Sequence, residues 1–270
     1  MASLFSRRRP APTGKRLTGF SRYTELLGTH LKRYMIVNLF TIIAFIPLAL
    51  GIFFSIMSTS ILVLIPSCIL GGMIAGPGLS AMLDCIYRSF RDASGKILPD
   101  YKNALKKNFK ASLVPGILLG IMTGFYSFTF MLFYWSRVFP GWNRIIMLLL
   151  SLFLFIMIMS ICWPQIILFT MPVKQMLVNA LLFTSTFFWK MAGISALTIA
   201  YLAVMVLLFP PSILLILITG FWFIMFTTNF IIYEPLNQSF KLEEIISEKF
   251  PEQTPFYETD EEWLNRKRPS

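Results

Sequence analysis

The chain has 270 residues, of which 56% are hydrophobic and 14% charged, and its formal net charge is +11. Soluble domains carry about 25% charged residues, so this composition excludes an ordinary soluble domain and indicates a membrane protein. The basic residues lie beside the ends of apolar blocks, where anionic lipid head groups attract them. We therefore expect lipid contact and no nucleic-acid partner.

Residues 1–34 form a basic segment that we expect on the cytoplasmic side. Its Arg- and Ser-rich beginning is also typical of a mitochondrial presequence, but Pro10, Pro12 and a poor apolar face count against that interpretation. From Thr18 to Arg33 apolar residues recur every three or four positions, which predicts an interfacial amphipathic helix with a bend at Gly28. A simple extension of the first membrane span fits the same pattern.

Six apolar blocks follow, and each is long enough to cross a bilayer, which takes about 20 helical residues. They cover residues 35–57, 61–87, 111–135, 145–171, 191–209 and 212–233. Inside lipid every backbone amide must bond within its own helix. The sequence therefore predicts an all-α fold, a polytopic bundle of six transmembrane helices over residues 35–233, with short interfacial helices on the cytoplasmic side.

The basic residues also predict the orientation of the bundle. If both termini are cytoplasmic, 22 of the 24 Lys and Arg residues lie inside, and only Arg137 and Arg144 lie outside. The positive-inside rule then favours an N-in, C-in topology. Residues 234–270 hold nine acidic and five basic residues, so we expect an acidic cytoplasmic tail after the last span.

The second block contains an unusual run of small residues, GGMIAGPG. Its members are Gly71, Gly72, Ala75, Gly76, Pro77 and Gly78. The run is compatible with a broken helix that binds a ligand and with a helix that packs closely against a neighbour through the GxxxG pair Gly72 and Gly76. We favour close packing, with a kink near Met73 caused by Pro77, and we expect this face to contact a partner protein as well.

Two inner-face segments are candidates for docking onto a partner. YKNALKKNFK places aromatic and apolar residues on one face of a short helix and lysines on the other. The stretch 171–209 is too long for one crossing, so a second short helix is expected before the fifth span. Either helix could dock a partner or seal the base of the bundle, and we favour sealing for the second. The docking candidates are Tyr101, Leu105, Phe109, Lys174 and Trp189.

Polar residues inside the spans are few. They are Asn38, Asp84, Gln165 and Asn229. Asp84 precedes Arg88 by one helical turn, which predicts a local ion pair, and the amides are expected to bond to neighbouring helices or to line a path. His30 lies outside the spans, and the three cysteines lack the spacing of a metal or redox site. We therefore expect no catalytic residues, no cofactor and no metal.

Four stretches together carry a family resemblance. They are NLFTIIAFIPLALG (38–51), GPGLSAMLDCIYRSFRD (76–92), YKNALKKNFKASLVPGILLG (101–120) and WPQIILFTMPVKQMLVNALLF (163–183). In this order they resemble the bacterial YesL-like membrane protein family, a domain of unknown function (family 624). The resemblance spans residues 19–240. It implies a multi-pass protein of the bacterial cell membrane that is associated with carbohydrate ABC transporters, and it implies no catalytic residues.

Two functional hypotheses follow. The first is a non-enzymatic accessory subunit that contacts carbohydrate ABC permease subunits and supports their assembly, stability or regulation. The second is an independent small-solute transporter or channel with Asn38, Gln165, Asn229 and Asp84 along its path. A homo-oligomer is compatible with both hypotheses.

Overall fold

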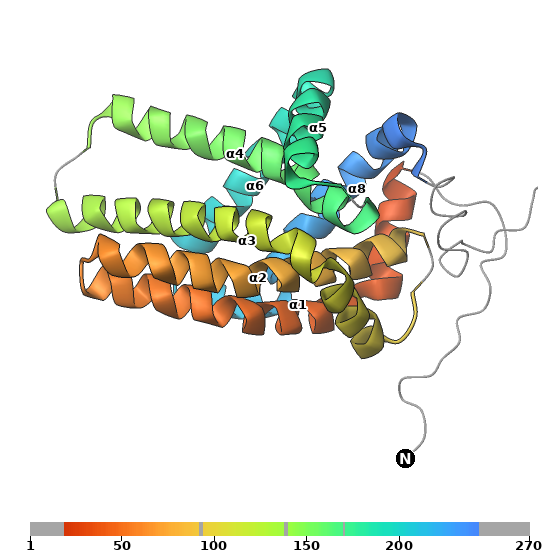
Figure 1. Cartoon of the computed structure of the whole chain (residues 1–270), viewed down its shortest axis with the longest axis horizontal. Helices are drawn as coiled ribbons and strands as arrows, with labels where there is room; N and C mark the ends of the chain where they lie inside the picture. Colours follow the sequence, from red (N-terminus) through yellow and green to blue (C-terminus); the bar gives the residue numbers. More distant parts are fainter. Residues whose placement is uncertain (1–18, 92–93, 138–139, 170, 243–270) are drawn as a thin grey trace, which may run out of the picture.

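The structure is a computed structural model, and it describes residues 19–91, 94–137, 140–169 and 171–242. Every regular element in this part of the chain is an α-helix (Figure 1). In chain order they are α1 (Gly19–Met57), α2 (Ile61–Phe90), α3 (Ile97–Ser136), α4 (Trp142–Leu168), α5 (Val173–Thr186), α6 (Phe188–Leu207), α7 (Ser212–Ile218) and α8 (Gly220–Phe240). The predicted all-α fold is confirmed. The basic residues before 19 and the acidic tail after 242 lie outside the described residues.

The apolar helices match a polytopic membrane bundle. Five of them, α1, α2, α3, α4 and α6, are long and apolar enough to cross a bilayer. The bent pair α7 and α8 provides a sixth crossing if it counts as one span. The six predicted spans correspond to these elements in order.

The helices α1 and α3 are 39 and 40 residues long, about twice the length that a bilayer requires. In Figure 1 the red beginning of α1 and the olive beginning of α3 turn away from the direction of the long helices. The two predicted inner-face elements at 18–33 and 101–110 are therefore the first turns of spanning helices. The prediction of a separate short helix at 101–110 is wrong, because no residue interrupts the helix between it and the third span.

The helix α2 lies at the centre of the bundle. It packs between α1 and α3 along its length (Figure 1). In its most apolar window 44% of the residues are buried within the chain, against 17–22% for the other four long helices. Near its C-terminal end, α2 meets α1 and α8 in an aromatic cluster, where the Phe226 ring lies 5.1 Å from that of Tyr34 and 5.5 Å from that of Phe90.

The second half of the chain packs less closely. The helix α4 diverges from α3 and packs mainly on α5 and α6, while α5 runs across the direction of the long helices (Figure 1). Between α3 and α4 the Tyr126 hydroxyl lies 2.8 Å from that of Ser151. Much apolar surface of α4 and α6 consequently faces outward, toward lipid.

The last predicted span is not one straight helix. The axes of α7 and α8 differ by 58° across a break at Thr219, whereas the sequence predicts one span over 212–233. Gly220 has a φ of +28°, a conformation that side chains with a Cβ rarely adopt. The prediction of a continuous sixth span is therefore corrected to two half-helices.

Candidate functional site

The small-residue run of α2 is a seam inside the chain. A Cβ atom added at Gly76 would lie 2.6 Å from the Ser112 carbonyl oxygen and 2.7 Å from the Gly116 Cα. Gly78 faces α1, where an added Cβ would lie 2.6 Å from that of Ala44. Such distances leave no room for a side chain, so the glycines allow three helix backbones to approach closely.

All six members of the run are buried against other parts of the chain. They are Gly71, Gly72, Ala75, Gly76, Pro77 and Gly78. The helix continues unbroken through them, so the packing interpretation holds and the ligand-binding break does not. The prediction that this face also contacts a partner protein is wrong, because α1 and α3 already cover the face. The kink near Met73 stays a prediction.

The matching glycines of α3 were missed in the sequence. Gly116 and Gly120 lie against Gly72, and Gly124 lies against Cys68. The spacing of four residues in GILLGIMTG is the same signal as in α2, and it was present in the third apolar block. When two helices of one chain both carry glycines at this spacing, the pattern predicts that the two helices pack against each other.

Asn38 holds the break between α7 and α8. Its side-chain amide donates hydrogen bonds to the carbonyl oxygens of Ile216 (3.0 Å) and Leu217 (3.2 Å). Its oxygen accepts from the backbone amides of Phe221 (3.0 Å) and Trp222 (3.4 Å). A broken helix leaves such groups unsatisfied, which is costly in lipid. One fully buried asparagine therefore satisfies both half-helix ends.

Tyr201 of α6 fixes the same break from the opposite side. Its hydroxyl donates to the Gly220 carbonyl oxygen at 2.7 Å and lies 3.2 Å from the Thr219 hydroxyl. A Cβ added at Gly220 would lie 2.7 Å from both amide atoms of Asn38. The break is thus a specified feature with dedicated residues on α1 and α6, which the apolar pattern of the sequence does not reveal.

Asn229 bonds to a neighbouring helix and to its own helix, and Asp84 bonds within its own helix. The Tyr87 hydroxyl donates to Asn229 Oδ1 at 3.1 Å, and Asn229 Nδ2 donates to the Met225 carbonyl oxygen. Arg88 Nε donates to Asp84 Oδ2 at 2.8 Å, so the predicted ion pair of one helical turn is confirmed. Neither residue shares a bonding partner with Asn38.

Gln165 differs from the other polar residues of the spans. Its side chain is fully buried near the C-terminal end of α4, and neither its amide nitrogen nor its amide oxygen has a hydrogen-bond partner among the described residues. An unsatisfied buried polar group costs about 1–3 kcal/mol. In the described part of the chain, Gln165 is therefore the one predicted path residue whose side chain makes no hydrogen bond.

Buried arginines make hydrogen bonds where α1, α2 and α3 lie close to one another. Arg33 of α1 donates to Asp100 Oδ2 at 2.6 Å and to the Gly95 carbonyl oxygen at 2.9 Å, which ties the start of α3 to α1. Arg91 follows the end of α2, and its Nε donates to the Tyr87 carbonyl oxygen at 3.2 Å. Burial lowers the pKa of the Arg91 guanidinium.

The docking candidates differ in exposure. Tyr101 is buried, and its hydroxyl donates to the Gly78 carbonyl oxygen at 3.3 Å, so its assignment as a docking residue is wrong. Leu105 is half-buried and Phe109 is exposed. Lys174 on α5 is also exposed, and Trp189 at the start of α6 is 85% exposed.

Exposed apolar residues lie on α5 and at the start of α6. We name this set the α5–α6 face, and it consists of Val178, Leu181, Leu182, Phe188 and Trp189. On α5, the residues Met176, Ala180 and Phe183 are buried against the bundle. Apolar residues therefore lie on both the bundle side and the outward side of α5.

The described residues contain no group of three or more His, Cys, Asp or Glu side chains that could hold a metal ion. No family model, curated protein or solved structure matches the chain. In the part of the chain that the structure describes, the fold and the buried polar contacts define a polytopic α-helical membrane protein with one broken span.

Proposed function

We propose that this chain is a non-enzymatic accessory subunit of a membrane transporter in the bacterial cell membrane. The α5–α6 face carries the proposal. It exposes 85% of the Trp189 side chain and 63% of that of Leu182 at the inner end of the bundle. The helix α5 has only 14 residues and runs across the direction of the long helices (Figure 1), so it is too short to be a span whose outer surface must be apolar for lipid. Its exposed apolar residues therefore favour a protein contact, and Trp is enriched where such contacts are strongest.

The glycine seams support the same assignment, because they are not available to a partner. The glycine seams of α2 and α3 are filled within the chain, so they anchor the bundle and leave the partner to bind elsewhere. Lys174 and Lys190 flank the α5–α6 face and suit the inner membrane surface. The resemblance to the YesL-like family supports a carbohydrate ABC permease as the partner.

Affinity purification in mild detergent from the native host, grown on inducing carbohydrate, tests this function. We expect the permease and ATPase subunits of a transporter to co-elute with the wild-type chain in stoichiometric amounts. Replacement of Leu182 and Trp189 by Ala should remove them. The matched control is Phe130→Ala, which truncates a side chain on α3 that is 62% exposed and should leave co-elution unchanged. Elution of the wild-type chain alone would contradict the proposal.

A second candidate function is an independent small-solute transporter. The break between α7 and α8 favours it, because discontinuous helices form substrate sites in many secondary transporters. The unpaired Gln165 amide could serve a polar solute. This function predicts solute flux in liposomes that contain only this chain, with a reduced rate for Gln165→Leu or Asp84→Asn. Absence of flux for a panel of sugars and ions would count against it.

A further inference from the structure

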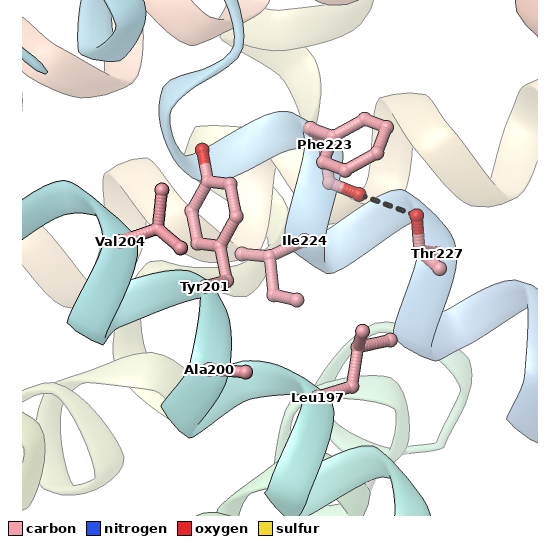
Figure 2. A pocket seen from close by; sticks show the side chains of 7 residues that line it. All are labelled: Leu197, Ala200, Tyr201, Val204, Phe223, Ile224 and Thr227. Carbon is pink, nitrogen blue, oxygen red and sulfur yellow. Dashed lines mark hydrogen bonds between the residues drawn. The ribbon is translucent and has the colours of Figure 1, made fainter.

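An apolar groove lies between α6 and α8, directly beside the break. Leu197, Ala200, Tyr201 and Val204 of α6 face Phe223, Ile224 and Thr227 of α8 (Figure 2). The groove has a volume of ≈ 260 Å³. Leu197 and Val204 are 40% and 47% exposed, so the groove opens sideways into the hydrocarbon region that the spans cross.

The polar atoms on the groove wall are already bonded within the chain. The Tyr201 hydroxyl donates to the Gly220 carbonyl oxygen. The Thr227 hydroxyl donates to the Phe223 carbonyl oxygen (dashed in Figure 2) and lies 2.9 Å from the Tyr23 hydroxyl. The surface left for an occupant is therefore hydrocarbon, which suits an acyl chain and offers a polar solute no hydrogen bond.

Two side chains of opposite charge lie beyond the groove toward the predicted inner end, one on α6 and one on α8. Lys190 precedes Leu197 by seven residues, and Glu234 follows Thr227 by seven residues. Seven residues make two helical turns, so each charged side chain shares the face of its groove residue at a distance of about 10 Å along the axis. That distance fits within one leaflet, whose hydrocarbon layer is about 15 Å thick.

The two charges do not pair with each other. The Lys190 ammonium lies 5.9 Å from the centre of the Phe187 ring, and Glu234 Oε1 accepts from Gln238 at 2.9 Å. No ion pair joins Lys190 to Glu234 in the described part of the chain. A cation and an anion above an apolar groove are complementary to a zwitterionic head group above an acyl chain.

We propose that the groove binds phosphatidylethanolamine. One acyl chain lies between α6 and α8, the phosphate lies beside Lys190, and the primary ammonium donates a hydrogen bond to Glu234. The ammonium group is the feature that selects this lipid. Phosphatidylglycerol has no cation for Glu234, and the choline group of phosphatidylcholine has no N–H to donate.

Photolabelling tests the acyl-chain site. The full chain is reconstituted in phosphatidylcholine liposomes with a trace of phosphatidylethanolamine that carries a diazirine in mid-chain, and labelled residues are mapped by mass spectrometry. We expect the label on residues 197–204 and 223–227. Ala200→Phe fills the groove and should reduce the label there by about tenfold, which corresponds to 1.4 kcal/mol. The matched control, Ala203→Phe, changes an exposed alanine outside the groove and should have no effect.

The head group is tested with the same diazirine on phosphatidylglycerol and on phosphatidylcholine. We expect weaker groove labelling by both lipids, and Glu234→Gln should remove the preference for phosphatidylethanolamine. Equal labelling by all three lipids would overturn the head-group assignment. Uniform labelling of every lipid-facing helix, unaffected by Ala200→Phe, would mean bulk lipid contact only and would overturn the site. Gel filtration of each variant verifies that it remains folded.

Discussion

At the scale of single residues, Asn38 illustrates how a polar side chain inside a span contributes to stability. Its amide bonds to two carbonyl oxygens and two backbone amides at the break. Isolated interhelical hydrogen bonds in membranes contribute about 0.6 kcal/mol. Without the Asn38 side chain, four backbone groups would be unsatisfied in lipid. Asn38 therefore contributes more to stability than one such hydrogen bond.

Replacement of Asn38 by Leu should therefore lower the free energy of unfolding by about 2–3 kcal/mol, the cost of leaving buried polar groups unsatisfied. Thermal unfolding in detergent measures the effect. Asn179→Leu is the control, since that half-buried asparagine donates to a weak acceptor, the Met171 sulfur, at 3.6 Å. Equal stability of Asn38→Leu and the wild type would show that the amide does not hold the break.

The glycine seam leads to a second prediction at this scale. Gly76→Ala should destabilise the bundle by about 1–3 kcal/mol, the usual cost of overpacking, because the new methyl group meets the α3 backbone. Gly193→Ala on α6 is the matched control, since a Cβ there meets nothing within 4 Å. Comparison of the two melting temperatures checks the prediction. A loss of stability in Gly193→Ala alone would contradict the packing described here.

At the scale of elements, the pair Arg33 and Asp100 joins α1 to α3. Both side chains are largely buried, with 6% and 13% exposed. Loss of one member leaves an uncompensated charge and typically costs about 3–5 kcal/mol. We expect Arg33→Met to destabilise the protein by that amount and Asp100→Leu, added to it, to restore part of the loss. A double variant less stable than Arg33→Met would show that the pair is not coupled.

Much of the element pattern could be predicted from the sequence. Runs of apolar residues define the spans because lipid enforces helices of a minimum length, and the i, i+4 spacing of Asp84 and Arg88 is sufficient to predict their pair. The break at Gly220 could not be predicted, since it depends on Asn38, some 180 residues earlier. Tyr101 was assigned to the surface because its own helix is amphipathic, while the covering residues belong to α1 and α2.

At the scale of the whole molecule, the charge distribution predicts both termini inside. Cysteine accessibility tests this topology, because the native Cys68, Cys85 and Cys162 are buried. Ser58 and Gln175 are exposed on opposite sides of the predicted membrane. We expect an impermeant maleimide to label Ser58→Cys in intact cells and Gln175→Cys only after permeabilisation. The reverse pattern would invert the orientation.

The bundle thus combines a closely packed half, α1 to α3, with a looser half whose apolar surface remains open. The closely packed half is held by glycine seams and buried arginines. The looser half carries both the α5–α6 face and the apolar groove between α6 and α8. We interpret the closely packed half as a rigid anchor in the membrane and the looser half as the side that binds other molecules.

The central claim is that the α5–α6 face binds a transporter subunit, and site-specific photocrosslinking in living cells tests it most directly. A photoreactive phenylalanine analogue replaces Leu182, and the same analogue replaces Phe130 on α3 as the control. The account predicts a crosslink from position 182 to a carbohydrate permease subunit and none from position 130. Crosslinks to lipid alone at both positions would contradict it.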